Sequence, residues 1–133
     1  MKTTLSEIKD IIDQLAQKID APNDLLPTFG YPIDDGRTDI EIDDNGQIYY
    51  FPDERDRERL FLRDLDDLLY YVFNSVTQAM ATKYELSRRI SGQDPRRIWF
   101  AEQERLLGIL DKKWELRKID EHKQVLKNHP FRN

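Results

Sequence analysis

Six carboxylates fall within eleven consecutive residues of this 133-residue chain: Asp34, Asp35, Asp39, Glu41, Asp43 and Asp44. Carboxylate oxygens suit Mg²⁺, so the cluster could support phosphoryl chemistry. They also suit a cationic protein surface, which an acidic cluster attracts before contact. Their spacing organises no metal site, because they fall on an expected loop and hairpin, where charged side chains also keep sheet edges apart. A binding surface and a solvated edge are therefore both favoured over metal catalysis.

A calcium loop is a second interpretation of the same stretch. Gly46 would take the sixth position of such a loop, where a glycine is required. The first position would then be Glu41 instead of an aspartate, and the twelfth would be Pro52, which has no carboxylate. A hairpin turn explains these residues without a metal.

The two histidines, His122 and His129, lie seven residues apart at the expected last helix. With Ile119 and Leu126 they share one helix face, which predicts partly buried histidines beside a core. The chain has no cysteine and no GxSxG, P-loop or HExxH pattern. We therefore expect no catalytic residue, no metal ligand and no cofactor. A small metal-dependent hydrolase that uses the aspartate cluster or the two histidines is the alternative.

Four arginines flank the expected turn at Ser91–Gly92: Arg88, Arg89, Arg96 and Arg97. The arrangement is compatible with a helix-turn-helix reader of DNA, but the first helix is far too long and the second exposes Glu102 and Glu104. Ion pairs of Glu85 with Arg89, and of Asp94 with a nearby arginine, would instead brace the helix junction. A DNA-binding regulator is a further alternative, with Arg96 and Arg97 as its contacts.

Charge divides the chain into two halves. Residues 1–75 hold 18 acidic and 8 basic residues, a net charge of −10, whereas residues 76–133 hold 8 acidic and 13 basic residues, a net charge of +5. The acidic half disfavours nucleic acid and favours a cationic protein partner. No apolar run is long enough to span a bilayer, and the lack of cysteine suits a reducing compartment, so we expect a cytoplasmic protein.

The hairpin that carries the acidic cluster has a register that the sequence predicts. Asn45–Gly46 is the preferred pair for a two-residue type I′ turn, because both positions need positive φ. Such a turn places Asp44 opposite Gln47, Ile42 opposite Tyr49 and Ile40 opposite Phe51. We expect one face to bury Ile40, Ile42, Tyr49 and Phe51, and the other to expose Glu41, Asp43, Ile48 and Tyr50.

Helices are expected on both sides of this hairpin. The first spans about Thr4 to Ile19 with a capping box of Thr4 and Glu7, and residues 23–36 are irregular. A third strand at residues 57–62 would complete an antiparallel meander. A long helix follows from Asp64 to about Ile90, then one that begins at Asp94–Pro95, and a last one from about Asp111 to Pro130.

Together these elements predict an α+β fold: an N-terminal helix, a small three-stranded antiparallel meander, and three helices packed on it with a long central helix. At 133 residues, we expect residues 1–133 to form a single domain.

Three segments carry a resemblance to a known family: LLPTFGY (25–31), DLDDLLYYVFNSVTQAMATKYELSRRISGQDPRR (64–97) and HPF (129–131). In this order they resemble the immunity protein 63 family of bacterial polymorphic toxin systems. Gln78 stands where the family pattern suggests an aromatic residue, and Tyr71 where it suggests tryptophan. The resemblance implies a protein that binds and blocks a cognate toxin, and it implies no catalytic residues.

The toxin-facing residues must be chosen from chemistry, since the family does not assign them. We expect partner binding at Glu41, Asp43, Asp44, Ile48 and Tyr50 of the hairpin, with Asp34 and Asp35 of the flanking loop. Tyr50 would be the central anchor, because tyrosine is favoured at binding hot spots. A nuclease is the toxin class that such an acidic surface suggests. The oligomeric state is not predicted.

Overall fold

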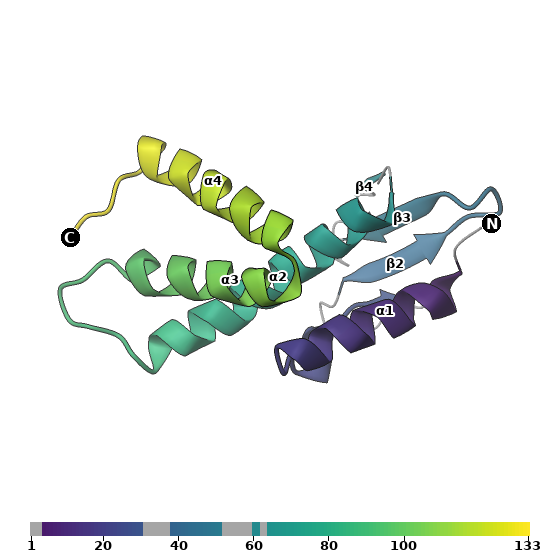
Figure 1. Cartoon of the computed structure of the whole chain (residues 1–133), viewed down its shortest axis with the longest axis horizontal. Coiled ribbons are helices and arrows are strands. Elements are labelled where there is room, and N and C mark those ends of the chain that lie inside the picture. The colour runs from purple at the N-terminus through teal and green to yellow at the C-terminus, as the bar shows by residue number, and fades with distance from the viewer. Residues whose placement is uncertain (1–3, 31–37, 52–59, 62–63) are drawn as a thin grey trace. The chain divides into compact units, whose positions relative to one another are not determined.

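The computed structural model of the chain describes residues 4–30, 38–51, 60–61 and 64–133. These residues divide into two compact units, Met1–Val72 and Phe73–Asn133. The boundary falls inside helix α2 (Leu65–Leu86), so its first turns belong to the first unit and the others to the second. The expected α+β class is confirmed, because helices α1 to α4 accompany a small sheet (Figure 1). The expected single domain stays a prediction.

Helix α1 (Leu5–Lys18) begins at the predicted cap. The Thr4 hydroxyl oxygen accepts the backbone N–H of Glu7 at 3.1 Å, which satisfies one of the unpaired donors of the first turn. Ile8, Ile12 and Ala16 form its buried face, and the helix lies alongside β2 (Figure 1). At its end the Ala21 N–H bonds to the Ala16 carbonyl, and Asp20 takes the left-handed position with φ of +53°.

Among the described residues the sheet has four strands, in the order β1-β2-β3-β4. The predicted meander is β2 (Asp39–Ile42), β3 (Ile48–Phe51) and β4 (Leu60–Phe61), with both pairs antiparallel. Residues 57–59 and 62 of the expected third strand lie outside the described residues. β1 (Thr28–Phe29) pairs in parallel with β2, although it lies in the segment 23–36, where an irregular structure was expected. That segment also contains the short 3₁₀ helix η1 (Asn23–Leu25).

The register of the β2–β3 hairpin differs from the predicted one by one residue. Ile40 pairs with Tyr50, Glu41 with Tyr49 and Ile42 with Ile48. A one-residue shift moves every side chain of one strand to the other face of the sheet. Ile40, Ile48 and Tyr50 are therefore buried, while Tyr49 is on the face of Glu41. The expected inward position of Tyr49 and the expected outward positions of Ile48 and Tyr50 are wrong.

The turn itself explains the shift. The Gly46 N–H bonds to the Asp43 carbonyl at 2.9 Å, and Gly46 has φ of +81°. Asn45 does not have the positive φ that a type I′ turn needs. This is a type I turn followed by a left-handed glycine, the usual form of a three-residue hairpin loop. The Asp43 carboxylate stabilises it by accepting the backbone N–H groups of Asn45 and Gln47, at 3.0 and 2.9 Å.

The second unit contains the rest of α2 with α3 (Arg96–Leu110) and α4 (Lys112–Asn128). Helices α3 and α4 form an antiparallel hairpin (Figure 1). Its core includes the rings of Phe73 and Trp114, which stack with centroids 6.2 Å apart. Helix α2 ends at Leu86 and not near Ile90, and both side chains are more than half exposed, so no core holds them in a longer helix.

The predicted starts of the last two helices are confirmed. The Asp94 carboxylate accepts the backbone N–H of Arg96 at 3.0 Å, and Pro95 already has helical dihedral angles. The Asp111 carboxylate accepts the backbone N–H of Lys113 at 2.8 Å. Among the described residues, no helix has the length and apolarity that crossing a membrane requires. The expected packing of three helices on the sheet stays a prediction.

Candidate functional site

The exposed end of the β2–β3 hairpin carries part of the acidic cluster. Asp43 and Asp44 are exposed and Glu41 and Tyr49 are half-buried. The Tyr49 hydroxyl lies 3.3 Å from Asp43 Oδ2 and donates a hydrogen bond to it. Because Glu41 and Tyr49 pair across the strands, they present an acid and an aromatic ring on one face. We call Glu41, Asp43, Asp44 and Tyr49 the hairpin face.

Two of the residues predicted to bind a partner are buried. Tyr50 is 2% exposed and Ile48 is 8% exposed. The Tyr50 ring lies 6.4 Å from the ring of Tyr71 within the first unit. Tyr50 thus has almost no surface to offer to a partner, and Tyr49 is the tyrosine on the hairpin face. Asp34 and Asp35 lie outside the described residues.

Asp39 of the acidic cluster has a structural environment. It is 1% exposed, and its Oδ1 accepts hydrogen bonds from the Thr28 hydroxyl at 2.7 Å and the Gly30 N–H at 3.1 Å. These bonds join β1 to β2 beside the parallel pairing of Thr28 with Asp39. Asp39 Oδ2 has no hydrogen-bond partner among the described residues. The cluster therefore divides into a buried member that fixes the sheet and exposed members at the hairpin end.

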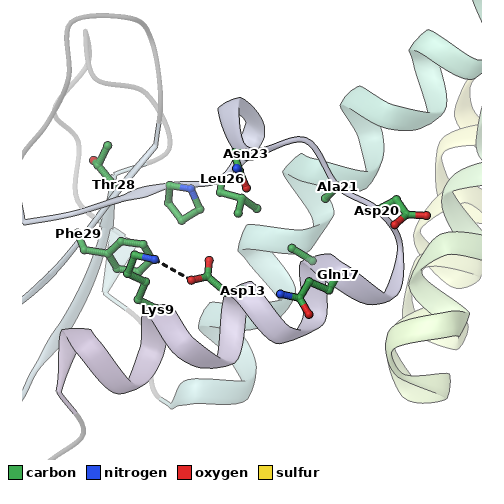
Figure 2. Close-up of a pocket in the computed structure, with 11 residues that line it drawn as sticks. Lys9, Asp13, Gln17, Asp20, Ala21, Asn23, Leu26, Thr28 and Phe29 are labelled. Atoms are coloured by element: carbon green, nitrogen blue, oxygen red, sulfur yellow. Dashed lines mark hydrogen bonds and ion pairs between the residues drawn. The ribbon is translucent and has the colours of Figure 1, made fainter.

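A second polar feature of the first unit is a hollow beside α1, of about 630 Å³ (Figure 2). Lys9, Asp13 and Gln17 line it from α1, Asp20 lines it from the turn after that helix, and residues of the segment 23–29 line it from the other side. Lys9 Nζ and Asp13 Oδ2 form an ion pair at 2.7 Å. Sequence reasoning missed this hollow, because its walls come from a helix and from a segment expected to be irregular. The four-residue spacing of Lys9, Asp13 and Gln17 was the only local signal.

The histidines occupy different environments in the second unit. His122 is buried, its ring stacks on Phe100 with centroids 3.8 Å apart, and Nδ1 lies 2.6 Å from Glu104 Oε2. Its Nε2 lies 3.1 Å from Gln103 Oε1. Burial lowers the pKa of His122, and the hydrogen bond to Glu104 opposes that effect. His129 is exposed, and its backbone carbonyl accepts a hydrogen bond from Arg96.

The arginines near the α2–α3 turn form the predicted braces. Arg89 Nε and Nη2 donate to the two oxygens of the buried Glu85 at 2.9 and 2.7 Å. Arg96 donates to Asp94 and also to the backbone carbonyls of His129 and Pro130, at 2.8 and 2.9 Å. The Arg96 guanidinium holds the pKa of the Asp94 carboxyl well below its usual range, although burial opposes it. These contacts fix the junction and the end of the chain.

The two units also separate by charge. Residues 1–72 contain 18 acidic and 8 basic residues, so their net charge is −10, and residues 73–133 contain 8 acidic and 13 basic residues, so theirs is +5. In the part of the chain that the structure describes, no group of three or more histidine and carboxylate side chains is arranged to hold a metal ion. The exposed chemistry of the first unit is thus that of an acidic protein surface.

Comparison with known proteins gives a family match. A family model described as immunity protein 63 matches residues 44–124, which is more than half of the chain. The matched residues include β3, the hairpin turn from Asp44 onward and most of the three later helices. No curated protein and no solved structure matches significantly.

Proposed function

The chain belongs to the immunity protein 63 family, and on that premise we propose that it neutralises its cognate toxin by stoichiometric occlusion. An immunity protein acts by binding, so its function requires a complementary surface and no turnover. The family match is the observation that carries this proposal. We place the protein in the cytoplasm of the producing cell, as a single domain that contacts neither nucleic acid nor membrane.

The hairpin face is the surface that we assign to the toxin. Asp43 and Asp44 are exposed on a unit of net charge −10, and such a surface attracts a cationic partner and speeds association. Tyr49 supplies the aromatic ring that binding hot spots favour, in the role first expected of Tyr50. A nuclease, whose active surface is cationic because it binds phosphates, is the toxin class that this chemistry suits best.

A double charge reversal tests the location. Glu41→Lys with Asp44→Lys inverts the charge of the hairpin face and leaves Asp43, which holds the turn, in place. We expect toxin affinity to fall at least about tenfold, because like charges then face each other across the interface. The measurement is the dissociation constant for the toxin encoded beside this chain, together with survival of cells that produce both proteins.

The matched control reverses two exposed carboxylates elsewhere in the same unit, Asp10→Lys with Asp24→Lys. It changes the net charge by the same amount without touching the hairpin. If both double variants lose affinity equally, general charge and not the hairpin face determines binding. If the unaltered chain does not protect cells from the toxin, neutralisation itself is contradicted.

A further inference from the structure

The hollow beside α1 has the size and the lining of a recognition site. Its volume of about 630 Å³ falls within the range of about 300–1,000 Å³ that is typical of ligand sites. Its wall combines apolar side chains, among them Leu26 and Phe29, with polar groups from α1 (Figure 2). This combination suits an occupant that has an apolar stem and a polar head.

The charged groups of the wall have an excess of acid. Lys9 pairs with Asp13, so the exposed carboxylate of Asp20 contributes an additional negative charge. The amides of Gln17 and Asn23 each add one acceptor oxygen beside their own N–H donors. The wall carries two carboxylates and one amino group, and the unit around it has a net charge of −10. The complementary occupant is a cation with several hydrogen-bond donors.

We propose that this hollow receives an arginine side chain from a protruding loop of the toxin. A guanidinium is planar and has five N–H donors, so it can serve acceptors that are spread over a wall. The ammonium of a lysine is compact and strongly hydrated, and suits such a wall less well. The stem of the arginine would lie along Leu26 and Phe29. The inference rests on the proposed function for the nature of the partner and adds a second contact surface to the hairpin face.

The test uses a small probe, N-acetyl-arginine methylamide, and its neutral counterpart made from citrulline. In an NMR titration of the full chain, we expect saturable shifts at the backbone amides of Asp13, Gln17 and Asp20 with the arginine compound. The citrulline compound has nearly the same shape but no charge, and should not shift the signals of those amides. Equal shifts with both compounds, or shifts confined to other surfaces, would overturn the proposal.

Two variants with opposite expected effects make the test specific. Asp20→Asn removes the carboxylate charge, and asparagine tolerates the left-handed backbone found there, so the fold is kept. It should weaken arginine binding about fivefold or more. Lys9→Gln removes the internal competitor for Asp13 and should tighten binding about twofold. Asp10→Asn and Lys18→Gln make the same charge changes on exposed positions of α1 outside the hollow and serve as controls.

If each variant matches its control, the effect is one of net charge and the hollow is not the site. The titration contains no toxin, so its outcome is independent of neutralisation. Failure of the unaltered chain to protect cells would contradict the proposed function and leave the arginine result standing. Absence of saturable arginine binding would contradict the assignment of the hollow and leave toxin neutralisation standing.

Discussion

The end of the β2–β3 hairpin and the α2–α3 junction each turn the chain around an aspartate, but the two carboxylates are satisfied differently. Asp43 is exposed and accepts backbone N–H groups, and no arginine or lysine among the described residues forms an ion pair with it. Asp94 is buried and lies against the guanidinium of Arg96. The hairpin therefore projects charge outward, whereas the junction neutralises its charges internally.

This difference assigns separate roles to the two regions. Arg96 is largely buried and donates to one carboxylate and two backbone carbonyls, so little of its hydrogen-bonding capacity is left for a partner. Exposed ion pairs contribute little to stability, so exposed acids can exchange such contacts for contacts with a partner. We therefore expect the junction to serve stability, and we propose the hairpin face for recognition. Variants of buried and of exposed residues test this difference between the two regions.

The largest expected effect separates two adjacent tyrosines of β3. Tyr50 is buried, so Tyr50→Ala should lower the free energy of unfolding by about 3 kcal/mol or more, through lost burial and a cavity. Tyr49→Ala should lower it by less than about 1 kcal/mol and weaken toxin binding instead. Urea unfolding and toxin titration of both variants give the measurement. If Tyr49→Ala were the more destabilising variant, the register expected from a type I′ turn would be correct.

The reversed positions of Tyr49 and Tyr50 show which features the sequence could predict and which it could not. Helix starts at Thr4, Asp94 and Asp111 were predicted, because a cap depends only on residues within three or four positions. Asn45–Gly46 fits two turn types, and in the observed one the carboxylate of Asp43 accepts the N–H groups of Asn45 and Gln47. A one-residue difference in the loop then reversed the faces of β3.

Contacts between distant residues were harder to predict. The pairing of β1 with β2 joins Thr28 to Asp39, and no local pattern in residues 23–36 indicates a parallel partner. The hollow lies between α1 and residues of the segment 23–29. It could not be predicted without the pairing of β1 with β2, which positions that segment. The acidic cluster was recognised from composition, but its division into a buried Asp39 and an exposed hairpin end required the sheet.

The second expected effect concerns the junction. Asp94→Asn keeps the size of the side chain but removes the charge that faces Arg96, and so leaves a largely buried guanidinium without its counterion. We expect the melting temperature to fall by roughly 5–10 °C. Asp44→Asn removes one carboxylate from the exposed hairpin end and should change the melting temperature by about 1 °C or less. Equal effects of the two variants would contradict the division between buried and exposed acids.

The smallest expected effect is the pH dependence of the second unit between pH 8 and pH 5.5. Burial lowers the pKa of His122 below its ordinary value of 6.5, so below that pH the unfolded chain binds a proton more readily than the folded one. Stability should therefore fall as the pH drops through about 6.5 and level off below the pKa of the folded state. The lowered pKa values of Asp94 and Glu85 act in a different window, because their stabilisation is lost only as the pH falls below the ordinary carboxyl range.

Two single variants isolate the contribution of His122, because His129 is the only other histidine in the sequence. His122→Phe keeps a ring against Phe100 and should remove the loss of stability between pH 8 and pH 5.5, whereas His129→Gln alters an exposed side chain and should retain it. Melting temperatures of both variants across this range give the measurement. A loss that persists in His122→Phe would mean that another group causes it. If the unaltered chain instead became more stable as the pH falls, Glu104 would outweigh burial, because a histidine kept protonated by its carboxylate stabilises the fold at low pH and not at high pH.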